Sequence, residues 1–337
     1  MGLGYQGYVS LINGGNSNTL LATGGGLNMV LEPIYSTAVW GAGWYNASTG
    51  HYADGALRYE GAINAEMQDI SAVWNFIRNW AIEQRAYGQS IDYSPDGHNL
   101  FQYHATNAGV TYDNFGVWLK GLTLHTNSGS FVTADLDCLA LHRVVSQAGM
   151  QSTYISNKNG IIGSNAAAYG ATCPLNPGGN NLSPVPFWKT NAAIVVSGSA
   201  AAGQALDWNI SVQNSPVVLY TCSGVREATA VLMGAIDATA STTFYNDGGV
   251  FDPIVGPAGG SGTPNQPYSY AQNTSFVVTI NPGGGAVTIT MPAVVIGSDA
   301  YNLGGISEAV TRAFNMKGLA TCPSTTVVPP VLMSVAS

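Results

Sequence analysis

Short runs of Val, Ile, Thr and aromatic residues alternate along the whole chain with clusters of Gly, Pro and Asn. Such runs are typical of half-buried β-strands, and the clusters are typical of the turns between them. In the first half, the predicted strands cover residues 8–12, 27–31, 57–67, 89–93, 99–105, 116–125 and 131–142. In the second half, they cover residues 192–196, 206–212, 217–220, 230–240, 276–280, 286–291 and 310–317. The pattern therefore predicts a mainly β protein.

One segment has helical periodicity instead. Between residues 69 and 85, the apolar residues recur at the spacing of a single helix face. They are Ile70, Val73, Trp74, Ile77 and Ala81. We expect one clear α-helix here, flanking the first half of the chain.

A short motif occurs twice. Residues 61–65 read GAINA and residues 234–238 read GAIDA, and similar strands precede each copy. The economical interpretation is one β-domain present twice, at residues 1–145 and 187–320. Residues 146–186, rich in Gly, Asn, Ser and Pro, would form a linker or arm. Residues 321–337 would form a C-terminal arm that could dock on a neighbour.

The chain is unusually poor in charge. Only 8% of its 337 residues are charged and the net charge is −8, whereas a soluble globular protein carries about 25% charged residues. An aromatic content of 10% argues against disorder, and ten cations are too few for a basic nucleic-acid reader. Either neighbouring molecules cover the surface, or hydroxyls and amides alone keep it soluble. The first option indicates an assembly subunit, and the second a secreted or shell-like β protein.

Targeting and membrane signals are not found. The N-terminus has no cationic segment followed by an apolar stretch, and no apolar run reaches the length of a membrane span. The four cysteines, Cys138, Cys173, Cys222 and Cys322, are too widely spaced to predict a zinc site, and buried thiols are the favoured interpretation.

Candidate chemistry is sparse. Asp135 and Asp137 would point to one face of a strand, but glycosidase carboxylates usually come from separate strands. A solvated or lumen-facing strand is therefore favoured. The histidines do not have metal-site spacing, and no nucleophile elbow, phosphate loop or dinucleotide motif is present. We expect no catalytic residue, no cofactor and no metal, and thus a protein that is not an enzyme.

Four aromatic residues lie close together between positions 40 and 52, among Gly, Ala, Asn and Thr. They are Trp40, Trp44, Tyr45 and Tyr52. Such a cluster could stack on a carbohydrate, or it could form the centre of a protein–protein interface. The low charge elsewhere favours the interface.

Several segments of the second half resemble the tail tube protein of long-tailed bacteriophages. They are residues 186–190 (PFWKT), 207–212 (DWNISV), 219–221 (LYT) and 230–240. The first half has a similar layout, from the opening strand at residues 7–11 to the run at residues 131–143.

The resemblance implies two tandem tube domains, each a β-sandwich or partial barrel. It also implies stacked rings of three chains with pseudo-sixfold symmetry, or alternatively of six chains, in the virion tail after assembly in the host cytoplasm. The partners would be other copies of the chain and other tail proteins. Genomic DNA would pass through without specific binding, and no membrane would be involved.

The repeated strand suggests which residues would face that channel. Alternation places Glu60, Asn64 and Glu66 on one face, and the second copy carries Asp237 and Thr239. We expect these polar residues to line the lumen. The alternatives are a β-sandwich carbohydrate-binding or adhesion module, or another structural protein of a phage tail or capsid.

Overall fold

Antiparallel β-strands make up almost all of the described structure, as the sequence predicts. The structure is a computed structural model. It describes residues 9–13, 16–35, 52–68, 71–78, 103–107, 110–147, 184–196, 199–201, 204–220, 222, 226, 230–232, 234–245, 274–281, 285–302, 310–321 and 328–336.

The first half contains nine strands and one α-helix within these residues. They are β1 (Val9–Asn13), β2 (Asn16–Gly25), β3 (Asn28–Leu31), β4 (Ile34–Tyr35), β5 (Tyr52–Ala53), β6 (Leu57–Glu66), α1 (Ser71–Ile77), β7 (Tyr103–Asn107), β8 (Val110–Asn127) and β9 (Thr133–Gln147). Helix α1 lies within the predicted helix, whose part after residue 78 is outside the described residues.

The second half begins with a 3₁₀ turn (Phe187–Lys189), and eleven strands are described there. They are β10 (Thr190–Val196), β11 (Ser199–Ala201), β12 (Gln204–Asn214), β13 (Val217–Leu219), β14 (Ala230–Leu232), β15 (Ile236–Tyr245), β16 (Thr274–Ile280), β17 (Val287–Met291), β18 (Val294–Asn302), β19 (Thr311–Gly318) and β20 (Leu332–Val335). Most of the proposed linker, residues 148–183, lies outside the described part of the chain.

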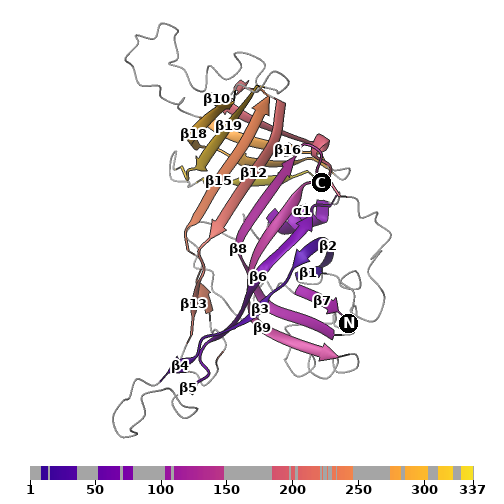
Figure 1. The fold of residues 1–337 in the computed structure, drawn as a ribbon, viewed down its shortest axis with the longest axis vertical. Coiled ribbons are helices and arrows are strands. Elements are labelled where there is room, and N and C mark those ends of the chain that lie inside the picture. The colour runs from indigo at the N-terminus through magenta and orange to yellow at the C-terminus, as the bar shows by residue number, and fades with distance from the viewer. Residues whose placement is uncertain are drawn as a thin grey trace.

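One large sheet of 11 strands runs through both halves of the chain (Figure 1). Its continuous path is β2-β6-β9-β8-β12-β15-β19-β18, and every neighbouring pair is antiparallel. The two halves meet where β8 pairs with β12, over residues 121–127 and 207–213.

The eight strands of this path form two sets of four with the same topology. In chain order, the first set is β2, β6, β8, β9 and the second is β12, β15, β18, β19. In space, the two sets are ordered β2-β6-β9-β8 and β12-β15-β19-β18. The ladder shifts register at corresponding strands, in β2 and β12 and again in β8 and β18. Four strands are thus repeated with the same order and direction, and a register shift occurs in corresponding strands, though at different positions along them.

The repeated sequence motif occupies the same place in both sets. A Cβ atom on Gly61 would collide with the carbonyl oxygen of Gly26, and one on Gly234 would collide with the carbonyl oxygen of Ser215. Gly26 directly follows β2, and Ser215 directly follows β12. Both glycines therefore sit where the neighbouring strand leaves no room for a side chain.

Different elements cover the buried face of the large sheet in the two halves. In the first half, the pairings β8–β7, β7–β1 and β1–β2 close the strands into a partial barrel, and α1 packs inside the fold. In the second half, a separate sheet of order β11-β10-β16-β17-β20 lies behind β12, β15 and β19 (Figure 1). The C-terminal segment joins this sheet, because β20 pairs with β17 of the same chain.

A single main hydrophobic core fills the space behind the large sheet. Phe276 from the second sheet belongs to the same core cluster as Phe244 and Phe314 from the large sheet, and Trp74 of α1 is equally buried. Phe244 and Phe314 pack edge to face, with ring centroids 6.1 Å apart. The opposite face of the large sheet is left free of this core.

Candidate functional site

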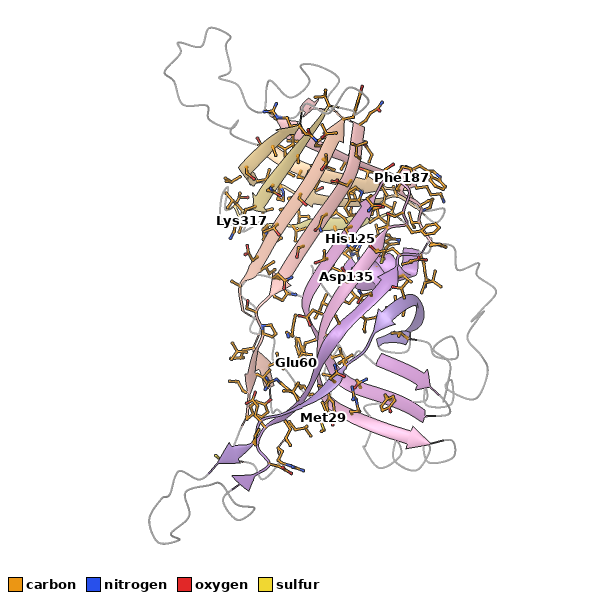
Figure 2. The ribbon with its side chains drawn as sticks, viewed as in Figure 1. Met29, Glu60, His125, Asp135, Phe187 and Lys317 are labelled. Atoms are coloured by element: carbon orange, nitrogen blue, oxygen red, sulfur yellow. The ribbon has the colours of Figure 1, made fainter. Side chains whose placement is uncertain are left out.

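The face of the large sheet that points away from the core is polar across both halves of the chain. We call it the polar face. Its residues on the six inner strands include Glu60, Asn64, Glu66, Thr123, His125, Thr133, Asp135, Asp137, Asn209, Ser211, Gln213, Asp237, Thr239, Ser241, Asn315 and Lys317. Figure 2 shows Glu60, Asp135, His125 and Lys317 spread along it.

Strand alternation produces this face. On β15, Asp237 and Thr239 are exposed, whereas Ala238 between them and Ala240 after them are buried. On β6, Asn64 is exposed between buried Ile63 and Ala65. Residues two apart share one side of a strand, so along the aligned rows each inner strand contributes polar side chains to one face and apolar ones to the core. Further along β8 and β9, the same side carries Trp118, Leu139 and Leu141, which form a separate apolar cluster with Val231 of β14.

The registers align these side chains in rows across the strands. One row contains Glu66, Thr133, His125, Asn209, Ser241, Asn315 and Ser298. The next contains Asn64, Asp135, Thr123, Ser211, Thr239, Lys317 and Val295. Glu60, Asn64, Glu66, Asp237 and Thr239, the residues that the sequence pairs as channel-facing, therefore lie on one face of one sheet.

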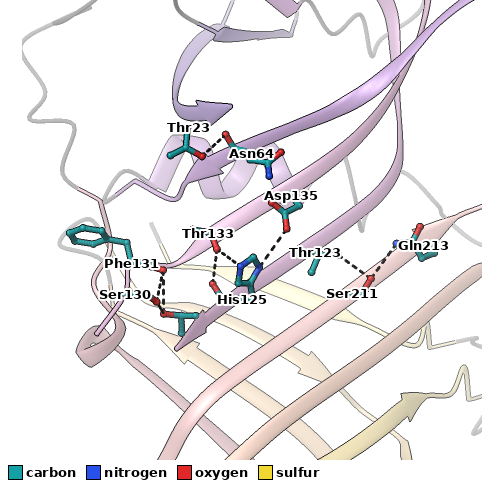
Figure 3. A network of polar contacts seen from close by, with 11 residues as sticks. Thr23, Asn64, Thr123, His125, Ser130, Phe131, Thr133, Asp135, Ser211 and Gln213 are labelled. Atoms are coloured by element: carbon teal, nitrogen blue, oxygen red, sulfur yellow. Dashed lines mark hydrogen bonds and ion pairs between the residues drawn. The ribbon is translucent and has the colours of Figure 1, made fainter. Parts of the chain in front are cut away.

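A side-chain hydrogen bond connects the polar face across the boundary between the halves, and a second one within β12 supports it (Figure 3). The Thr123 hydroxyl donates to Ser211 Oγ at 3.1 Å, and the Gln213 amide donates to the same oxygen at 3.2 Å. On the buried side of this boundary, the Asn214 amide donates to the carbonyl oxygen of Leu119 at 3.1 Å. Polar contacts thus reinforce the β8–β12 ladder on both faces.

Carboxylates outnumber cations on the polar face. The carboxylates are Glu60, Glu66, Asp135, Asp137 and Asp237, and the cations are Arg58, Lys120 and Lys317. Lys120 bridges Glu60 at 3.3 Å and Asp137 at 3.6 Å, and Lys317 lies 3.1 Å from Asp237. The five carboxylates and three cations therefore leave the polar face with a net negative charge.

Glu60 is the most strongly paired of these carboxylates. It accepts a hydrogen bond from Arg58 Nε at 2.6 Å, and Arg58 also contacts Glu32. Burial alone would raise the pKa of the Glu60 carboxyl, but the Arg58 hydrogen bond and the charge of Lys120 outweigh it and lower that pKa. Glu60 therefore stays ionised near neutral pH.

We expect Glu60→Gln to lower the free energy of unfolding at pH 7 by about 0.5–1 kcal/mol, since solvent screens the pair. A lowered pKa in the folded state stabilises above the ordinary carboxyl pKa, and the benefit is lost as the pH falls through the folded value. In urea unfolding, the stability difference between the variant and the original chain should therefore shrink as the pH falls below the ordinary carboxyl pKa of about 4. Glu66→Gln is the matched control, because Glu66 pairs with no cation among the described residues. If the free energy lost in the variant did not shrink as the pH falls, the assignment of the Arg58 and Lys120 contacts would be contradicted.

His125 and its neighbouring carboxylate on the polar face do not form a hydrogen-bonded catalytic pair. His125 Nε2 lies 2.8 Å from Thr133 Oγ1, and its Nδ1 lies 3.7 Å from Asp135 Oδ2, which is beyond hydrogen-bond distance. Asp135 and Asp137 project from the same side of one strand, and Lys120 pairs with Asp137. No group of three metal-ligating side chains occurs within the described ranges.

The remaining predicted residues are only partly described. Trp40, Trp44 and Tyr45 lie outside the described residues, and Tyr52 lies in β5, opposite Tyr35. Cys138 is buried, which raises the pKa of its thiol, and Cys222 is exposed. Sequence reasoning missed the polar positions on β8, β12 and β19, although the alternation in each of these strands carries the same signal as in β6.

Comparisons with known proteins leave the function open. No protein-family model matches the chain, and no curated protein matches it at a significant level. None of the helices in the described part of the chain is both long and apolar enough to cross a membrane.

Proposed function

We propose that this protein is a structural subunit that assembles into rings and tubes, of the kind that forms a phage tail tube, and that its polar face lines the channel. The observation that carries the proposal is the eight-stranded path itself. One side of this path is covered by the hydrophobic core and the other side is a polar surface. The path also contains the same set of four strands twice.

The sheet has the properties of a segment of a larger barrel. Its two end strands, β2 and β18, run in opposite directions, so identical copies can join edge to edge and keep the ladder antiparallel throughout. Exposed edges are hazardous in a monomer, and closure removes them. We interpret each four-strand set with its covering layer as one tube domain.

The dimensions suit a channel for nucleic acid. Three copies supply about 24 strands, and at about 4.8 Å per strand they enclose a ring about 37 Å across between strand axes. Strand tilt widens it further. A channel of this diameter stays wider than a DNA double helix even after side chains extend into it from the strands. Three chains with two sets each also give the pseudo-sixfold symmetry that the resemblance implies.

The charge of the polar face suits passage without adhesion. Arg58, Lys120 and Lys317 are paired with Glu60, Asp137 and Asp237, and the further carboxylates Glu66 and Asp135 leave a net negative charge that would repel phosphates. Hydroxyls and amides fill the rest of the surface. The low overall charge of the chain then reflects an exterior that is covered by neighbours. We infer a virion location and no catalytic role.

Electron microscopy of the purified chain over a range of concentrations tests the proposal. We expect rings or tubes with a central hole, and a mass in solution that is a multiple of three chains. Hexameric rings would keep the tube but change the stoichiometry. Monodisperse monomers at high concentration would overturn the proposal, and binding of those monomers to a glycan array would favour the carbohydrate-binding alternative.

A further inference from the structure

We draw no further inference here: the strongest candidate, the outer face of the β13–β14 hairpin, on which Val217, Leu219 and Leu232 are exposed, carries no proposal because nothing in the described part of the chain shows what covers it.

Discussion

Replacing Gly61 or Gly234 with Ala should destabilise the fold by about 3 kcal/mol each, the upper part of the range for overpacked sites. In each case the new Cβ atom would meet a backbone carbonyl oxygen, that of Gly26 or that of Ser215. A backbone carbonyl cannot move aside as the end of a flexible side chain would. Urea unfolding at pH 7, fitted with a constant slope, measures both losses.

Gly24→Ala is the matched control for this prediction. Gly24 also lies in the β2–β6 ladder, but a Cβ atom there would have no neighbour within 4 Å. We expect its effect to be within about 0.5 kcal/mol. Similar losses at Gly24 and Gly61 would mean that backbone flexibility, rather than the close approach of strands, accounts for the glycines. A loss at Gly61 alone would contradict the structural equivalence of the two motifs.

Trp74→Ala should cost about 3–5 kcal/mol, the range for removing a large aromatic side chain from a core. Trp74 is completely buried, and its indole N–H donates to the carbonyl oxygen of Gln68 at 2.8 Å. The substitution leaves both a cavity and a buried carbonyl without this donor. Thermal unfolding followed by circular dichroism measures the loss.

Two further variants identify the origin of that loss. Trp74→Phe should recover most of the packing but not the hydrogen bond, so its cost should be intermediate. Trp188→Ala removes a Trp that is 71% exposed and should have little effect on the unassembled chain. A loss for Trp74→Ala as small as that for Trp188→Ala would contradict the position of α1 in the core.

The strands that the sequence predicts best are those with strong apolar alternation. The runs at residues 57–67, 131–142 and 206–212 correspond to β6, β9 and β12. The sequence does not predict β2, because its Asn, Ser, Thr and Gly residues are typical of turns, nor β18, which contains Gly297 and Asp299. Edge strands have fewer buried side chains, so their pattern is weaker. β20 was missed because prolines precede it.

The candidate site was predictable only strand by strand. Alternation within β6 identifies Glu60, Asn64 and Glu66, and the repeated motif adds Asp237 and Thr239. The sequence cannot show that β8 and β12 pair, because the two strands are far apart along the chain. Asp135, Asp137 and His125 therefore resemble isolated groups in the sequence, whereas the registers align them with the residues of β6 on one face.

Cryo-electron microscopy of the assembled protein, at a resolution that separates strands, tests the central claim most directly. The account predicts a closed ring of antiparallel strands in which eight from each chain surround the bore, with Asn64 and Asp237 pointing into it. An assembly in which these residues face outward, or in which other strands surround the opening, would contradict it.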